Sequence, residues 1–194
     1  MNYFSCRVFI SGSAGGQSIM TEVKLIPLTE DDREQFIRDN QRAFKYGATE
    51  EFGMRDDHFE EDEEIISRET IERSIDGGDA YRIMADGRKA GGVIVSLEGN
   101  KGDLEILFTL PEIHSRGIGQ AAWREIEKLY PDVEVWETLT PCFETRNIHF
   151  YVNKLGFHIV EYYCKFHPGP DGDQHDEYSE DSLDGMFRFE KRMK

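Results

Sequence analysis

The stretch from Leu107 to Tyr130 constrains the fold of this chain more than any other. An apolar, strand-like run stops at Pro111, glycines follow at positions 117 and 119, and an amphipathic, helix-like run then continues to Tyr130. This order can create a phosphate-binding place, because the first N–H groups of a helix have no internal partners and the helix dipole favours an anion there. Gly117 and Gly119 remove the Cβ atoms that would keep a pyrophosphate away from the backbone.

The spacing of these glycines excludes two common nucleotide-binding motifs. No third glycine follows, since position 122 is Ala122, and the Gly-Lys-Ser/Thr of a P-loop is absent. The run resembles the acetyl-CoA loop of the GNAT superfamily of N-acetyltransferases, whose pattern is Arg/Gln-x-x-Gly-x-Gly/Ala after a strand, often preceded by Pro-Glu-aromatic. The matching residues are His114, Ser115, Arg116, Gly117, Ile118 and Gly119, preceded by Pro111, Glu112 and Ile113, with His114 where the family usually has Arg or Gln.

A second segment, Asn147 to Phe157, resembles the last helix of the same family and the strand after it. The family form is aromatic-Tyr-x-x-x-Gly-Phe, whereas four residues separate Tyr151 from Gly156 in this chain. Either the helix is one residue longer at its C-terminal end, or Tyr151 is rotated by about 100° from the usual direction. The two motifs occur in the family's order, and the resemblance spans about Thr21 to Lys194.

The resemblance implies an α+β fold (a three-layer α/β arrangement). Its mixed, mostly antiparallel central sheet splays between the fourth and fifth strands, is flanked by about four helices, and holds acetyl-CoA in the gap. Apolar periodicity and turn residues such as Asp86-Gly87 predict elements in the same order. Strands are expected at 23–28, 81–85, 89–97, 104–110, 133–139, 157–166 and 185–193, and helices after Thr29 and at 65–75, 118–130 and 147–155.

The same resemblance implies which residues contact acetyl-CoA. The loop Ser115–Ala121 would hold the pyrophosphate, and the backbone of Phe108 and Leu110 would pair with the pantetheine arm like an added strand. A backbone N–H near Phe108 or Thr109 would stabilise the oxyanion. The expected contacts are Phe108, Thr109, Leu110, His114, Ser115, Arg116, Gly117, Ile118, Gly119, Gln120, Ala121, Asn147 and Lys154.

Tyr151 is the candidate acid for the departing CoA thiolate, because tyrosines at this point of the family helix often have that role. A tyrosine pKa of about 10 lies above that of a thiol, so the hydroxyl holds its proton at neutral pH. The alternative is a tyrosine that only packs under the cofactor. Asn147, one turn earlier on the same face, could bond the cofactor or a water, or could cap the helix.

The general base is expected among carboxylates on the strands. Asp103 and Glu105 lie two apart on one face of the fourth strand, and we favour Glu105. Glu137 on the fifth strand and His149 on the late helix are further candidates. Each carboxylate could equally be a solvated strand residue, and His114 is interpreted as a structural substitute for Arg.

The composition of the chain excludes some classes of ligand and indicates its cellular setting. A net charge of −16, from 39 acidic and 23 basic residues, argues against nucleic-acid binding, and it fits a cationic substrate or simply a soluble surface. No run approaches the ~20 apolar residues that would span a membrane. The 3 cysteines have wide spacing, which predicts a reduced, cytoplasmic setting. The acidic residues 56–64 and 171–177 are interpreted as solvated segments, and no metal site is expected.

Two functions remain open from sequence. The first is an N-acetyltransferase that moves acetyl from acetyl-CoA to a primary amine of a small molecule or peptide. The second is a non-catalytic acyl-CoA-binding sensor or regulatory module. We expect residues 20–194 to form the N-acetyltransferase domain, and residues 1–19 to be a linker-like extension outside it. Aromatic residues on the late strands also suggest a homodimer; they are Phe187, Phe189, Tyr162 and Tyr163.

Overall fold

The computed structural model describes residues 5–9, 20–49, 64–113, 117–169 and 185–194. The chain divides into two compact units. The first consists of Met1–Ser96 with Leu104–Pro131, and the second of Leu97–Asp103 with Asp132–Lys194.

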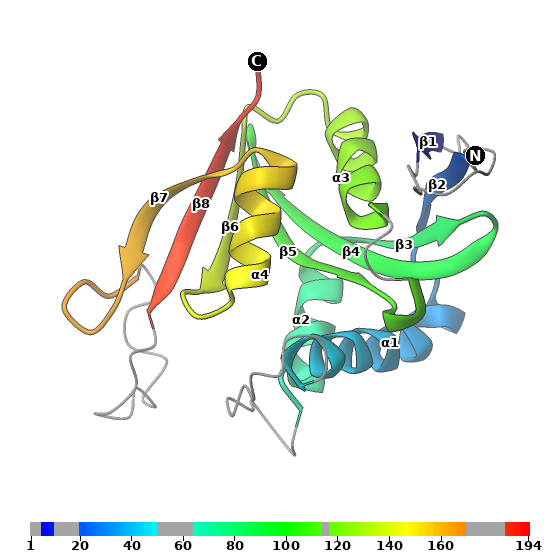
Figure 1. Ribbon diagram of the computed structural model, residues 1–194, viewed down its shortest axis with the longest axis horizontal. Helices are drawn as coiled ribbons and strands as arrows, with labels where there is room; N and C mark the ends of the chain where they lie inside the picture. The colour runs from blue at the N-terminus through cyan, green and yellow to red at the C-terminus, as the bar shows by residue number, and fades with distance from the viewer. Residues whose placement is uncertain (1–4, 10–19, 50–63, 114–116, 170–184) are drawn as a thin grey trace, which may run out of the picture. The chain divides into compact units, whose positions relative to one another are not determined.

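Strands of the first unit follow one another in space in chain order (Figure 1). The turn between the third and fourth of them is the predicted tight hairpin, because Asp86 and Gly87 both have positive φ, 48° and 77°. The strands are β1 (Ser5–Phe9), β2 (Met20–Pro27), β3 (Asp79–Ala85), β4 (Arg88–Glu98) and β5 (Lys101–Thr109), of which β5 begins in the second unit.

Helices cover both faces of the sheet in the first unit. Figure 1 shows α1 (Glu30–Thr49) and α2 (Arg68–Gly77) side by side on one face and α3 (Ile118–Leu129) on the other. Apolar side chains of α1 and α2 meet those of β4 and β5 in the core, since their apolar residues recur at helical and strand spacing. This core cluster contains Phe36, Ile37, Ala43, Ile66, Ile71, Ile94, Ile106 and Phe108.

A buried arginine fastens α1 to the sheet. Arg82 of β3 is 3% exposed, and its guanidinium binds the carboxylates of Asp32 at 2.8 Å and Asp39 at 2.9 Å. Burial alone would raise the pKa of Asp32, but the hydrogen bonds and charges of Arg82 and Lys89 outweigh it and hold that pKa below its ordinary value. Removing one partner of such a buried pair costs about 3–5 kcal/mol, so the network fixes the position of α1.

The second unit is a smaller sheet with one helical segment against it. The first residues of β5, Lys101–Asp103, pair in parallel with Val135–Glu137, and the neighbours that follow are antiparallel. Gly102 lies under the ring of Trp136, where a Cβ would come within 2.4 Å of the ring. The elements, in the strand order β6-β8-β7, are β6 (Val135–Pro141), α4 (Thr145–His149), the π-helix η2 (Phe150–Leu155), β7 (His158–Tyr163) and β8 (Met186–Arg192).

The predicted fold class is confirmed. The sheet is mixed and mostly antiparallel, and its parallel step lies between β5 and β6, the fourth and fifth strands counted from β2, which fits the expected splay. The hydrogen-bonded register there covers three residue pairs, although β5 runs on to Thr109 and β6 to Pro141.

Part of the N-terminal extension has regular structure. Ser5–Phe9 pairs antiparallel with Met20–Lys24 of β2. Whether residues 1–19 are needed for folding or activity stays a prediction. Among the described residues, no helix is both long and apolar enough to cross a membrane. Most of the acidic segment 56–64 lies outside the described residues.

Candidate active site

The end of β5 approaches β4 unusually closely. A Cβ on Gly91 would lie 2.1 Å from the carbonyl oxygen of Phe108, so only glycine fits there. Leu110 N–H donates to the Ala90 carbonyl at 2.9 Å, which carries the pairing past the end of the strand. Sequence reasoning selected Phe108, Thr109 and Leu110 but missed Gly91, although two glycines inside a strand pattern signal a close backbone approach.

The predicted glycine turn leads into α3 as expected. Pro111–Ile113 forms a short 3₁₀ turn, and Gly117 has the left-handed conformation, φ 71°, that favours glycine. The first bond of the helix runs from Ala121 N–H to the Gly117 carbonyl at 3.0 Å. The N–H groups of residues 118–120 therefore precede the helical ladder and can serve an anion.

At the start of α3, some side chains are buried in the core and others are exposed to solvent. Ile118 and Ala121 are buried and anchor the first turn, whereas Gly117 is exposed and Gly119 and Gln120 are half-buried. His114, Ser115 and Arg116 lie outside the described residues. The part of the loop that the structure describes thus offers backbone groups to a ligand and keeps its apolar side chains inside.

The favoured base, Glu105, points away from the core. Its side chain is exposed on β5, and Ser96 of β4 donates to its Oε1 at 2.8 Å. Asp103 is exposed as well, two residues earlier. Leu104, Ile106 and Phe108 occupy the buried face of the same strand, so the alternation placed both carboxylates correctly on one face.

The extra residue before Gly156 is absorbed by a wide turn. Residues Phe150–Leu155 form a π-helix, which ends where Phe157 N–H donates to the Tyr151 carbonyl at 3.0 Å and Gly156 takes φ 80°. One added residue in a helix commonly produces such a turn, and these turns are frequent at functional sites. The helix is therefore not simply one residue longer at its C-terminal end, as one alternative predicted; it widens locally around Tyr151.

Tyr151 is half-buried and packs against aromatic rings of its own unit. Its centroid lies 5.5 Å from that of Phe189 and 6.0 Å from that of Phe157. Burial raises the pKa of Tyr151 to about 12, while a hydrogen bond with Thr138 lowers it and the charge of Glu144 raises it further. The hydroxyl therefore keeps its proton throughout the neutral range and is a weaker acid than an ordinary tyrosine.

Other predicted residues of the late helix lie at its surface. Asn147 is half-buried, and it is not the cap, since α4 begins at Thr145 with Glu144 at the N-cap position. Lys154 and His149 are exposed, and His149 Nδ1 lies 3.0 Å from the amide nitrogen of Asn153. Asn147 therefore keeps only its possible contacts with a ligand or water.

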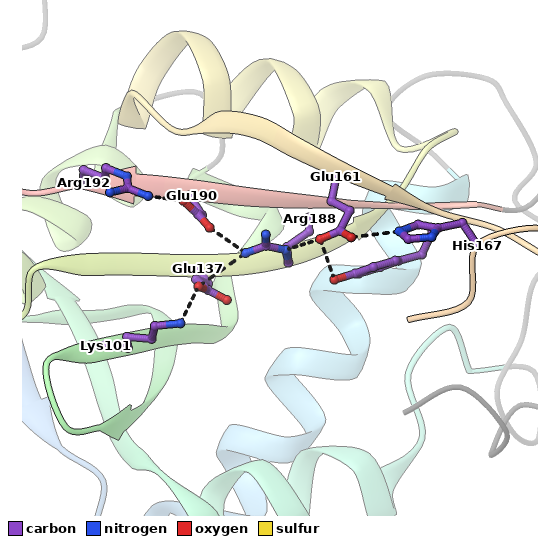
Figure 2. Close-up of polar contacts among 8 residues, drawn as sticks. Lys101, Glu137, Glu161, His167, Arg188, Glu190 and Arg192 are labelled. Carbon is purple, nitrogen blue, oxygen red and sulfur yellow. Dashed lines mark hydrogen bonds and ion pairs between the residues drawn. The ribbon is translucent and has the colours of Figure 1, made fainter. Parts of the chain in front are cut away.

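Glu137, the remaining candidate base, belongs to a charged network on β6, β8 and β7. Figure 2 shows Arg188 between three carboxylates, with Glu190 at 2.7 Å, Glu161 at 3.1 Å and Glu137 at 3.4 Å. Lys101 adds a second cation 3.5 Å from Glu137. The Arg188 guanidinium lowers the pKa of Glu190, and the His167 and Arg188 hydrogen bonds lower that of Glu161. Glu137 is thus an ion-pair partner, and sequence reasoning had missed the network.

Among the described residues, no group of three or more His, Cys, Asp or Glu side chains could hold a metal ion. Residues 171–177 lie outside that part of the chain, so their interpretation as a solvated loop stays a prediction.

Comparison with known proteins identifies the family. A model of the acetyltransferase (GNAT) family matches residues 34–157, and the chain belongs to this family. An uncharacterized protein of Bacillus subtilis strain 168, YrkN, is 41% identical over 172 residues, which cover 85% of this chain and 90% of that protein.

Solved structures of the family share the fold at low identity. The ribosomal-protein-S18-alanine N-acetyltransferase from Escherichia coli has a TM-score of 0.60 at 14% identity, with 88% of this chain and 93% of that chain covered. A GNAT family acetyltransferase from Elizabethkingia anophelis, solved with acetyl-CoA bound, has a TM-score of 0.53 at 16% identity, with 66% and 84% covered.

Proposed function

We propose that this protein transfers the acetyl group of acetyl-CoA to a primary amine of a small molecule or peptide. The observation that carries the proposal is the start of α3, where Gly117 turns the chain so that the N–H groups of residues 118–120 are available to a pyrophosphate. Membership of the acetyltransferase family supports the same reaction. The related Elizabethkingia protein was solved with acetyl-CoA bound.

The first unit is proposed to hold acetyl-CoA. The loop Ser115–Ala121, with His114 before it, would bind the pyrophosphate. Of the expected strand contacts Phe108, Thr109 and Leu110, the Leu110 N–H already donates to the Ala90 carbonyl of β4, so the backbone of Thr109, which points to the other side of β5, would pair with the pantetheine amides. Asn147 and Lys154 are proposed as further contacts of acetyl-CoA.

Glu105 and Tyr151 are proposed to move the protons. Glu105 would take a proton from the acceptor ammonium, directly or through water, so that the amine nitrogen can attack the thioester carbonyl carbon. When the carbon–sulfur bond breaks, Tyr151 would donate its proton to the thiolate. The pKa of about 12 keeps that proton in place at neutral pH, and it limits the acceleration that the hydroxyl can supply.

The cellular compartment and the oligomeric state are proposed from the cysteines and from the aromatic residues of the late strands. The wide spacing of the 3 cysteines, which gives neither a disulfide framework nor a Cys-x-x-Cys pair, supports a reducing cytoplasm. A homodimer through the late strands is proposed on the exposed ring of Tyr162; Phe189 is fully buried in its own unit and cannot contribute.

A turnover assay tests the proposed function. The full chain is mixed with acetyl-CoA and single amines, drawn from amino acids, polyamines, aminoglycosides and peptides with a free N-terminus, and free thiol is followed over time. At least one amine is expected to release thiol well above the rate without acceptor, with the acetylated amine found by mass spectrometry. Tight acetyl-CoA binding without turnover across the panel would instead indicate the acyl-CoA-binding module.

A further inference from the structure

Asn40 of α1 is fully buried without a hydrogen-bond partner. Neither its amide nitrogen nor its amide oxygen is bonded to any group in the described part of the chain. Polar neighbours on the same helix are paired, Asp39 with Arg82 at 2.9 Å and Gln41 with the Ile66 carbonyl at 3.4 Å. An unpaired buried amide lowers stability, and in native proteins it often marks a group that a ligand or a bound water completes.

Two contacts locate Asn40 beside the end of β5 and the turn that follows it. Four residues before it, the ring of Phe36 meets the ring of Phe108 edge-on at 5.2 Å. Two residues after it, Arg42 pairs with Glu112 at 2.9 Å. Because a helix rises ~1.5 Å per residue, Asn40 lies level with the segment between Phe108 and Glu112. It also shares the inward face of α1 with Phe36, since residues four apart lie one above the other.

We propose that Asn40 binds the acetyl group, with its Nδ2 donating to the thioester carbonyl oxygen directly or through one ordered water. This inference rests on the proposed function and on the expectation that the thioester lies near the backbone of Phe108 and Thr109. The oxygen gains negative charge when the amine attacks, and a fixed donor in an apolar surrounding stabilises that charge. Free CoA has no such carbonyl, so Asn40 would make the protein prefer acetyl-CoA to CoA.

The test compares Asn40→Leu with Gln41→Leu by calorimetry with acetyl-CoA and with CoA. Leucine keeps the branched outline of asparagine but is bulkier, and it removes an unpaired amide, so these effects oppose each other and the Tm of Asn40→Leu is expected to change little. Its affinity for acetyl-CoA should fall about tenfold, the value of one good hydrogen bond, while its affinity for CoA stays within about twofold. Gln41→Leu removes an amide that is already paired, so its Tm should fall and both affinities should stay unchanged.

The ratio of the two affinities decides the inference. An unchanged ratio of acetyl-CoA to CoA affinity in Asn40→Leu would overturn it, whatever happens to the Tm. Asn40→Ala gives the same ratio should the leucine variant fail to fold. In turnover, kcat of either variant should fall more than the KM for the acceptor rises. A wild-type protein that binds neither nucleotide would overturn the proposed function itself, which is a separate outcome from a changed or unchanged ratio.

Discussion

The start of α3 and the segment α4–η2 are both motif regions, yet their chemistry depends on different parts of the chain. At α3 the groups proposed to act are backbone N–H donors, and Gly117 in the left-handed conformation positions them. In α4–η2 the group proposed to act is one side-chain hydroxyl, that of Tyr151, whose direction depends on how the helix turns before Gly156. A backbone site therefore tolerates changes of side chain that leave the turn intact, whereas a side-chain site depends on the length of its helix.

The largest expected effect is on the backbone site. Gly119→Glu places a side chain and a negative charge where the pyrophosphate is proposed to lie, so acetyl-CoA affinity should fall on the order of 10³-fold, about 4 kcal/mol. Gly119 has no positive φ, so Gly119→Ala is a suitable control that adds only a methyl group and favours the helix. Gly117→Glu should also lose binding, with added backbone strain. Calorimetry that gave equal affinities for Gly119→Glu and wild type would refute the loop assignment.

The second-largest expected effect is on kcat, and it should leave the affinity for acetyl-CoA almost unchanged. Tyr151→Phe keeps the ring among Phe157 and Phe189 and removes the hydroxyl, so kcat should fall on the order of 10²-fold, the lower end for general acid catalysis. The affinity for acetyl-CoA should change little, in contrast to Gly119→Glu. Steady-state kinetics check both quantities. A kcat within about threefold of wild type would remove Tyr151 as the acid and leave the family assignment intact.

The pH dependence of stability should differ between the two regions. The pKa of Tyr151 is about 12 in the folded protein and about 10 in an unfolded chain, so unfolding releases a proton between these values. The raised pKa of Tyr151 contributes on the order of 2 kcal/mol to the free energy of unfolding. This contribution is fully present below pH 10 and is lost as the pH rises to 12. Urea titrations at pH 9 and pH 11.5 should show a smaller loss for Tyr151→Phe than for wild type. An equal loss in both proteins would contradict the raised pKa.

The smallest effect concerns the wide turn itself. Deleting Asn153, an exposed residue of η2, restores the family spacing between Tyr151 and Gly156 and should convert the π-helix to an ordinary turn. If the widening only absorbs the extra residue, kcat should stay within about threefold and the Tm should change by a few degrees. Deletion of Asp86 from the β3–β4 hairpin, where both turn residues have positive φ, is a control that should cost more stability. A large loss of kcat on deleting Asn153 would show that the π-turn sets the direction of Tyr151.

Local signals in the sequence predicted the fold and the Gly117 turn before α3 well. Asp86-Gly87, the Pro111 stop and the Gly117 turn each depend on the φ preferences of one or two residues, which a single sequence displays. The alternation in β5 likewise placed Glu105 outside and Phe108 inside.

Features that depend on distant pairing could not be predicted. Arg82 meets Asp39 and Asp32 across more than 40 positions of sequence, and Arg188 meets Glu137 across a similar span, so no local pattern identifies these pairs. Composition gave no hint that Asn40 would be buried unpaired. The extra residue before Gly156 was visible as a count, but the hydrogen bonds of the helix decide whether a turn lengthens, rotates or widens.

The chain's 2 tryptophans are divided between the two units, with Trp123 in α3 and Trp136 in β6 beside Gly102. Both are almost completely buried, and the Trp123 indole N–H donates to Glu127 at 2.6 Å. Each indole is therefore a built-in fluorophore for one unit, and its emission moves to longer wavelength when water reaches it. Replacing either tryptophan by Phe would leave a single tryptophan fluorophore in each variant. Coincident denaturation curves from the two would mean that both units melt as one cooperative body, and separate curves would give each its own midpoint.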